Sequence, residues 1–546
     1  MRQALAEAAG TAPRARFGNF ARAGADRPQR FASRLAPALA AAAVILTQAS
    51  ALRAEAPLSA IDWLSDSVQS PPAAGLPPVI DEPPVSSSVL PEDVTVMPLG
   101  VVSPDAAGLR PAAALGLPKK LWGPTSAADL GRAVRQMRAD MLPAPQGLLL
   151  HVLLAELDPP FDSDIRGVML LARVDKLLDI GALDQAAALL DLTGITQSTE
   201  IFRRAFDVAL LTGDEDRLCR TMDSAPSLSP TYPARIFCQA RNGDWETAAL
   251  TYGTARALGF LDASQEVLLG RFLDPHLFED EEMPPRTGPM TPLDFRLLEA
   301  IGEPPATASL PRAFAQLDLR QIAGWKAQIE AAERLARVGA ISADQLFALY
   351  TERRPAASGG VWDRAAAVQS LDAALSAGDI DKIAELLPQA WSKLASAELE
   401  PCFADMFARR LAEFKLTGTA GATAYRAALL TPDFEAAARA YGAGSGIETV
   451  LHGVALGEVP PPTGRDALIL AISEGFAAKG APSRVASLIA NQRTGEALLR
   501  AIDLVAAGAN GNLDELTDGL ATLRALGFET SARRAALELL ILDRRG

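Results

Sequence analysis

The chain has 546 residues, of which 49% are hydrophobic, 22% are charged and only 5% are aromatic. This composition is ordinary for a folded, soluble protein, and its frequent alanines favour helices. The formal net charge of −14 at pH 7 argues against nucleic acid and anionic lipid as partners, because both would repel the chain.

The first 56 residues show the order of regions that is typical of a secretory signal peptide. An arginine-rich run precedes an apolar stretch at residues 35–52, and A-x-A cleavage sites follow at 49–51 and 54–56. Cleavage would leave the mature chain in the bacterial periplasm, with no membrane insertion expected, and would change its net charge from −14 to −19. The alternatives are an uncleaved inner-membrane anchor facing the periplasm and an organelle transit peptide.

Thirteen prolines lie between residues 57 and 124. Residues 57–93 are predicted to be a Pro-rich flexible spacer. Residues 94–125 differ, because VTVMPLGVVSPDAAGLRPAAALGLPKKLWG (94–123) is too apolar for a tether and too rich in proline for a helix. We expect an extended apolar strap packed along the folded body, since exposed apolar surface costs about 25 cal/mol per Å².

A short amphipathic helix is predicted at the start of the spacer, in SAIDWLSDSV (59–68). Ile61, Trp63 and Leu64 would lie on its apolar face, an arrangement that suits docking into the groove of a partner protein. The alternative is a helix that packs back onto its own chain.

From about residue 126 onward one helical signature recurs. An apolar helix end is followed by a glycine, an acidic or small polar residue, and a new amphipathic helix. Glycine ends the first helix in the left-handed conformation, and the acid caps the free amides of the next helix or complements its dipole. Intervals between successive copies include 32, 30 and 39 residues. The copies surround Gly181, Gly213, Gly243, Gly339 and Gly378.

This pattern predicts an all-α solenoid of antiparallel helical hairpins, tetratricopeptide-like in geometry but without the tetratricopeptide consensus. We expect one repeat array at 126–278 and a second at 313–546, separated by a break at 279–312 that is rich in proline and acidic residues. The alternative is an irregular helical domain whose turns share glycine by convergence.

The last helix is apolar on nearly every side, whereas a terminal solenoid helix should carry one polar face. Leu540 and Ile541 are therefore candidates for docking a partner or for self-association. The alternative is a helix tucked into the body of its own chain.

Three cysteines occur, at 219, 238 and 402. In an oxidising compartment, Cys219 and Cys238 on neighbouring helices could form a disulfide, which would leave Cys402 over. The alternative is that all three are small buried hydrophobic residues.

No motif for catalysis, cofactor binding or metal binding is present, so we expect none of these sites. The three histidines lack a second ligand at metal spacing. His151 is predicted to be a structural residue in a buried or half-buried helix. The acid pairs Asp214/Asp216 and Asp379/Asp381 lie at helix starts, which explains them as caps rather than as catalytic carboxylates.

Three segments carry a resemblance to a known group: residues 94–123, ARIFCQARNGDW (234–245) and LRALGFETSARRAALELLILDRRG (523–546). The chain resembles uncharacterised exported alanine-rich proteins of alphaproteobacteria, some of them labelled antifreeze glycopeptide polyprotein. That label implies no established activity, and the Ala-Ala-Thr repeats of antifreeze glycopeptides do not occur here.

These features together predict an exported, non-catalytic helical-repeat scaffold that binds a protein or a peptide in the bacterial envelope. Two alternatives stay open: an all-helical enzyme acting on cell wall or polysaccharide, and a structural component of envelope assembly. An aromatic-lined groove at Trp245, Trp325, Trp362 or Trp391 would favour the enzyme.

Overall fold

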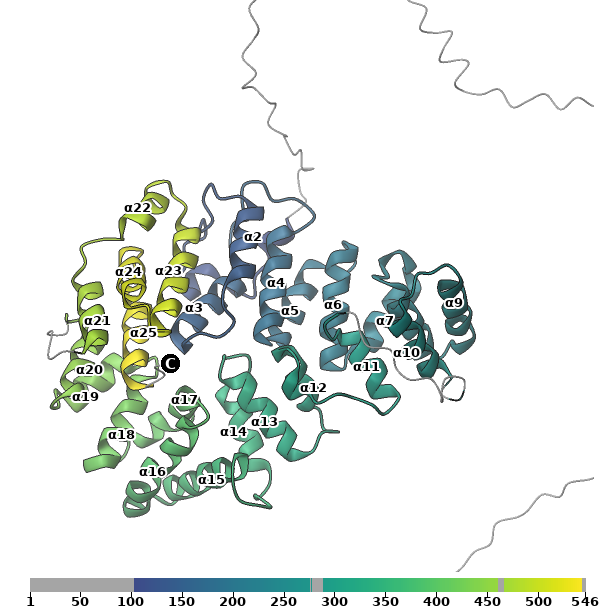
Figure 1. Cartoon of the computed structure of the whole chain (residues 1–546). Coiled ribbons are helices and arrows are strands. Elements are labelled where there is room, and N and C mark those ends of the chain that lie inside the picture. Colours follow the sequence, from purple (N-terminus) through teal and green to yellow (C-terminus); the bar gives the residue numbers. More distant parts are fainter. Residues whose placement is uncertain (1–102, 275, 277–287, 460–465, 543–546) are drawn as a thin grey trace, which may run out of the picture. The chain divides into compact units, whose positions relative to one another are not determined.

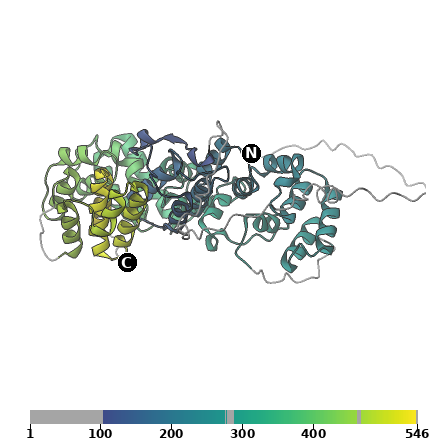
Figure 2. The same ribbon diagram turned by 90° about the horizontal axis from the view of Figure 1, so that it is seen from above.

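The computed structural model describes residues 103–274, 276, 288–459 and 466–542. All of them belong to one compact unit, Glu92–Gly546. They are mostly helical (Figures 1 and 2), which confirms the predicted all-α class. The expected leader and spacer, with Ile61, Trp63 and Leu64, lie outside the described residues.

Ten helices occupy the first half of this unit. They are α2 (Ala127–Gln136), α3 (Pro143–Leu154), α4 (Val168–Ile180), α5 (Leu183–Thr193), α6 (Thr199–Thr212), α7 (Glu215–Ser224), α8 (Tyr232–Arg241), α9 (Trp245–Ala257), α10 (Ala263–Leu273) and α11 (Pro292–Ala300). From α4 to α11, each helix packs against the next one along the chain.

Fourteen helices follow in the second half. They are α12 (Ala315–Asp318), α13 (Trp325–Ala336), α14 (Ala343–Glu352), α15 (Val361–Ala377), α16 (Ile380–Ala395), α17 (Glu400–Leu411), α18 (Gly418–Leu429), α19 (Phe434–Tyr441), α20 (Ile447–Leu456), α21 (Ala467–Ala477), α22 (Ser483–Ala490), α23 (Thr494–Ala509), α24 (Leu513–Ala525) and α25 (Glu529–Ile541). Consecutive packing continues from α12 to α20, after which α21 packs on α24 and α25 on α20. Among the residues described, no helix combines the length and the apolar character needed to cross a membrane.

The predicted turn chemistry is present at several helix junctions. Gly378 has a φ of 67°, and the side chain of Asp379 accepts a hydrogen bond from the amide of Lys382 at 3.2 Å. Asp244 accepts one from the amide of Thr247 at 3.1 Å in the same way. Asp214 is an exception, because its side chain makes no capping bond to α7.

The described part of the strap, residues 103–125, is fixed to the helices. It contains two 3-10 turns, η2 (Pro104–Ala106) and η3 (Ala112–Leu115), and the short strand β1 (Arg110–Pro111), which pairs in parallel with β2 (Ala155–Glu156). Leu121 and Trp122 are 0% and 2% exposed. Ala112, Leu115 and Leu117 are buried in the same core, where their apolar surface is removed from water.

A reciprocal polar contact joins the strap to α4. The buried carboxylate of Asp105 accepts hydrogen bonds from the amide of Leu170 and the hydroxyl of Ser163, both at 2.7 Å. In return, the buried Arg173 guanidinium donates to the carbonyl oxygens of Ala107 at 2.7 Å and Ala155 at 3.1 Å. Burial raises the pKa of Asp105 and lowers that of Arg173 to about 10.

The described part of the Pro-rich segment, residues 288–312, is partly helical, because it contains α11. Thr291 accepts a hydrogen bond from the amide of Asp294 at 3.1 Å, and Pro292 occupies the first helical turn, where its missing N–H is not needed. Helix α11 packs against α6, as does α12 farther along. This segment therefore supplies part of the folded body.

The last helix packs against the beginning of the body as well as against its neighbours. Helix α25 contacts α3, α20 and α24, and α23 contacts α2 and α3. Buried side chains from Ala112 to Leu542 form one continuous hydrophobic cluster.

Candidate functional site

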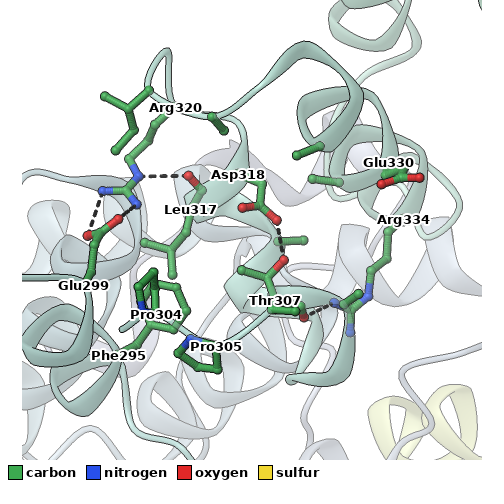
Figure 3. A pocket seen from close by; sticks show the side chains of 17 residues that line it. Phe295, Glu299, Pro304, Pro305, Thr307, Leu317, Asp318, Arg320, Glu330 and Arg334 are labelled. Carbon is green, nitrogen blue, oxygen red and sulfur yellow. Dashed lines mark hydrogen bonds and ion pairs between the residues drawn. The ribbon is translucent and has the colours of Figure 1, made fainter. Parts of the chain in front are cut away.

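A cleft of about 410 Å³ lies between α11, residues 304–308, α12 and α13. We call it the proline-rimmed cleft (Figure 3). Its apolar walls come from Phe295, Leu317, Pro304, Pro305 and several alanines of α12 and α13. Ile322, at its edge, is 77% exposed. The walls therefore offer an apolar surface that is already formed.

The polar groups of this cleft are engaged with one another or with the backbone. Asp318 accepts a hydrogen bond from the hydroxyl of Thr307. The Arg334 guanidinium donates to the carbonyl oxygens of Thr307 at 3.0 Å and Leu310 at 2.5 Å. Burial, and then the charges of Arg312 and Arg337, lower the pKa of Arg334. These contacts fix the polar side chains of the cleft, and none of them activates a nucleophile or a base.

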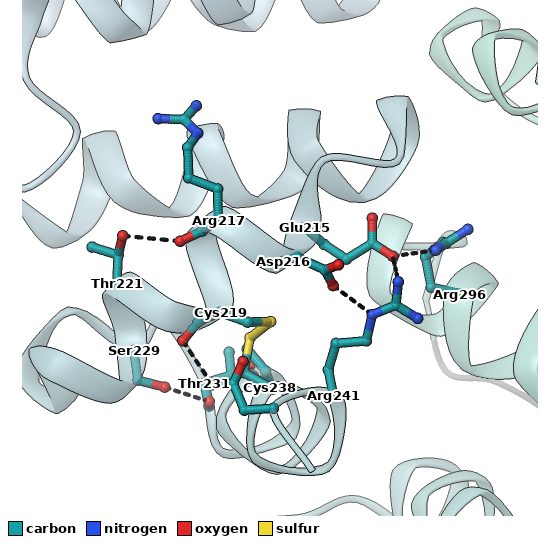
Figure 4. Close-up of a disulfide and its surroundings, with 12 residues drawn as sticks. Glu215, Asp216, Arg217, Cys219, Thr221, Ser229, Thr231, Cys238, Arg241 and Arg296 are labelled. Atoms are coloured by element: carbon teal, nitrogen blue, oxygen red, sulfur yellow. Dashed lines mark hydrogen bonds and ion pairs between the residues drawn. A yellow bond between two sulfur atoms is a disulfide. The ribbon is translucent and has the colours of Figure 1, made fainter.

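A chain of alternating charges leads from the cleft to the neighbouring helices. Arg320 and Arg296 both bind the carboxylate of Glu299, with an Arg296 Nη1–Glu299 Oε2 distance of 2.5 Å. Arg296 also pairs with Glu215, whose side chain is fully buried. Arg241 lies 3.4 Å from the same carboxylate (Figure 4). This chain ties α7, α8, α11 and the end of α12 together.

The acid pair at the start of α7 does not act as the predicted pair of caps. Asp214 makes no capping bond, and Asp216 instead binds the Nε of Arg241 at 2.7 Å. Asp379 does cap α16 as expected. Asp216 still lies in the first turn of α7, where its charge complements the helix dipole. The prediction of a capping bond is wrong for Asp214, whose side chain makes none.

A second hollow, of about 390 Å³, lies where α8, α9, α10 and α11 meet. We call it the aromatic pocket. Phe237, Phe272 and Trp245 supply its aromatic walls, and Arg241, Arg296 and Glu299 supply its charged groups. Trp245 is 49% exposed, and its ring centroid lies 5.7 Å from that of Phe272. Glu299 lines both hollows.

The other tryptophans singled out in the sequence belong to the packed body. Trp325 is buried and donates from Nε1 to the carbonyl oxygen of Leu349 at 2.8 Å. Trp362 packs on Trp325 with a centroid distance of 5.1 Å, and Trp391 packs edge-on against Phe403. Trp245, in contrast, lines the aromatic pocket.

Cys219 on α7 and Cys238 on α8 are joined by a disulfide (Figure 4), with a Cα–Cα distance of 4.7 Å. The bond links the two helices that also hold Glu215, Asp216 and Arg241. Cys402 is buried, and its Sγ lies 3.6 Å from the carbonyl oxygen of Ala336.

The C-terminal docking candidates pack against their own chain. Leu540 and Ile541 are half-buried and contact the hydrophobic core. Glu538, one turn earlier, is buried and accepts a hydrogen bond from the amide of Ala144 at 2.7 Å. This packing agrees with the alternative of a helix tucked into the body.

His151 lies on the exposed side of α3 between buried Leu149 and Val152, in a helix whose other residues are largely buried. Partial burial of the ring, followed by the charges of Arg110 and Arg534, lowers its pKa. Across residues 103–542, apart from the gaps given above, no group of three or more histidine, cysteine or acidic side chains is placed to hold a metal ion.

Comparison with protein-family models, curated proteins and solved structures finds no match to this chain. The resemblance to exported alanine-rich proteins therefore stays a prediction.

Proposed function

We propose that the protein is an exported, non-catalytic scaffold of the bacterial envelope that binds an extended segment of another protein in the proline-rimmed cleft. The observation that carries this proposal is the composition of the cleft. Its walls are largely apolar, and the carboxylates and guanidinium groups around it are already held by hydrogen bonds or ion pairs. Such a surface suits binding, because apolar contacts supply affinity and fixed polar groups supply orientation.

We also infer that the helices form the hairpins of a solenoid. The recurring turns support this arrangement, as does the packing of each helix on the next one within α4–α11 and within α12–α20. Solenoids expose long binding surfaces, which is consistent with a partner that lies extended along several helices.

Export is supported by the order of regions in the first 56 residues. The disulfide between Cys219 and Cys238 fits the same location, because disulfides persist in oxidising compartments such as the periplasm. We therefore expect the partner to be a protein of the bacterial envelope.

Site-specific photo-crosslinking tests the binding site. A photoreactive amino acid is placed at Ile322, at the cleft edge, and, as the matched control, at Ile380 on α16, which is 50% exposed. We expect ultraviolet light to yield a discrete adduct with one partner protein from position 322 and none from position 380. Identical adducts from both positions, or no adduct from 322, would contradict the proposal.

A further inference from the structure

We propose that the aromatic pocket binds the ring of a neutral saccharide. The proposal goes beyond the proposed function, because the pocket shares with the proline-rimmed cleft only Glu299 among the described lining residues. It rests on the shape of the pocket, on the charge of its polar groups and on their hydrogen-bonding capacity.

The aromatic walls offer a flat surface on which the apolar face of a sugar ring can stack. Trp245 stands half-exposed at the start of α9, backed by Phe272, and Phe272 in turn stacks on buried Phe237 at a centroid distance of 5.9 Å. Phe206 continues this series into the core, with a centroid distance of 6.5 Å from Phe237. The exposed indole is therefore held rigidly by packed aromatic rings, which lowers the entropy lost when a ligand stacks on it.

The charges around the pocket cancel. Arg241 and Arg296 line it, and each already faces carboxylates, namely Glu215 and Asp216 for Arg241, and Glu215 and Glu299 for Arg296. An anion would compete with these carboxylates, and a cation would compete with the guanidinium groups. A neutral ligand meets neither penalty.

The polar groups offer donors and acceptors side by side. The side chains of Arg241 and Glu299, which both line the pocket, are 45% and 24% exposed. A hydroxyl group both donates and accepts, so vicinal hydroxyls can bridge a guanidinium and a carboxylate. A proline-rich peptide, the other neutral ligand that aromatic grooves favour, lacks amide donors at its prolines.

We expect the pocket to bind the saccharide without cleaving its glycosidic bonds. Both carboxylates of an acid-base pair would have to be available to the ligand, whereas Glu299 is bound by Arg296 and Arg320, and Asp216 by Arg241. The role assigned to the pocket is therefore recognition of a saccharide.

Titration of the purified protein with neutral trisaccharides tests the inference. The probes are maltotriose, cellotriose and N,N′,N″-triacetylchitotriose, with a neutral proline-containing hexapeptide as the competing class. Binding of each is followed by saturation-transfer NMR and calorimetry up to about 10 mM. The variants are Trp245→Ala, Trp245→Phe and the matched control Leu250→Ala, which alters a 72% exposed side chain of the same helix outside the pocket lining. Thermal melting shows whether each variant is folded.

We expect at least one trisaccharide to bind the wild type and L250A equally. W245A should weaken that binding at least about tenfold, and W245F should weaken it less because a ring face is retained. The inference is overturned if no trisaccharide binds, if W245A binds like the wild type, or if only the hexapeptide binds. Photo-crosslinking from position 322 in the W245A variant distinguishes a failure of the saccharide inference from a failure of the proposed function.

Discussion

The carboxylate of Glu538, on the last helix, accepts a hydrogen bond from the backbone amide of Ala144, in the first turn of α3 and 394 residues earlier in the chain. Helix α3 begins at Pro143 after Leu142, which has no side chain able to cap it. The four first amides of a helix need external acceptors. Glu538 supplies one of them from the opposite end of the sequence, so α25 is a structural part of the N-terminal region.

Replacing Glu538 by alanine should lower the free energy of unfolding by about 1–3 kcal/mol, because a buried amide loses its acceptor. Glu538→Gln keeps an acceptor oxygen and should cost less. Glu385→Ala, on the exposed face of α16, is the control and should change stability by less than about 0.5 kcal/mol. Urea unfolding of the three variants checks the order, and equal stability of E538A and E385A would contradict the capping role.

Close packing of Trp122 against Gly495 holds the C-terminal end of the strap. A Cβ atom at position 495 would lie 2.6 Å from Cε3 of Trp122 and 2.9 Å from the carbonyl oxygen of Leu121. Gly495→Ala should therefore destabilise the fold by about 1–3 kcal/mol. Gly253→Ala, within α9 and with open space around it, should instead stabilise by up to about 1 kcal/mol. Opposite shifts in melting temperature are the expected result, and two shifts of the same sign would refute the close packing.

The Cys219–Cys238 disulfide closes a loop with a sequence separation of 19 residues. Loss of this bond in Cys219→Ser/Cys238→Ser should lower stability by about 3 kcal/mol, since the unfolded chain gains freedom. Thiol labelling of the protein isolated from its own envelope, without reductant, should modify Cys402 alone after unfolding. Labelling of all three cysteines would show that the bond does not form there.

Asp207 on α6 gives stability a defined pH dependence. Burial raises its pKa from 3.8 to about 6, against the opposing charges of Arg203 and Arg204. Between pH 3.8 and about 6, the carboxyl group of Asp207 binds its proton more tightly in the folded state than in the unfolded state. The contribution of Asp207 to stability therefore rises as the pH falls from about 7 to 4. Asp207→Asn should raise the melting temperature at pH 7.5 and leave it nearly unchanged at pH 4. An unchanged difference between variant and wild type across this range would contradict the raised pKa.

Local features were predictable from the sequence because their causes are local. The high alanine content predicted the helical class. The turn at Gly378 and Asp379, and the burial of Leu121 and Trp122 in the strap, follow from residues that are neighbours in the sequence. The spacing of Cys219 and Cys238 on adjacent helices likewise indicated a disulfide, without deciding it.

Contacts between distant residues were not predictable in the same way. Glu215 and Arg296 are 81 residues apart, and nothing in either local sequence marks them as partners. The sequence also did not show that His151 lies on the exposed side of α3, because this helix is apolar around most of its circumference. The aromatic pocket likewise depends on four helices whose meeting is set by tertiary packing.

The most direct test of the binding scaffold fills the proline-rimmed cleft and asks whether partners are lost. Ala327 lines the cleft on α13, and Ala384 is exposed on α16 away from it. We would isolate the wild type, Ala327→Trp and Ala384→Trp from the native envelope after crosslinking and quantify co-purifying proteins by mass spectrometry, with melting curves to confirm folding. The account predicts one protein that is retained by the wild type and A384W and depleted at least about tenfold with A327W. Full retention of every partner by a folded A327W would contradict it.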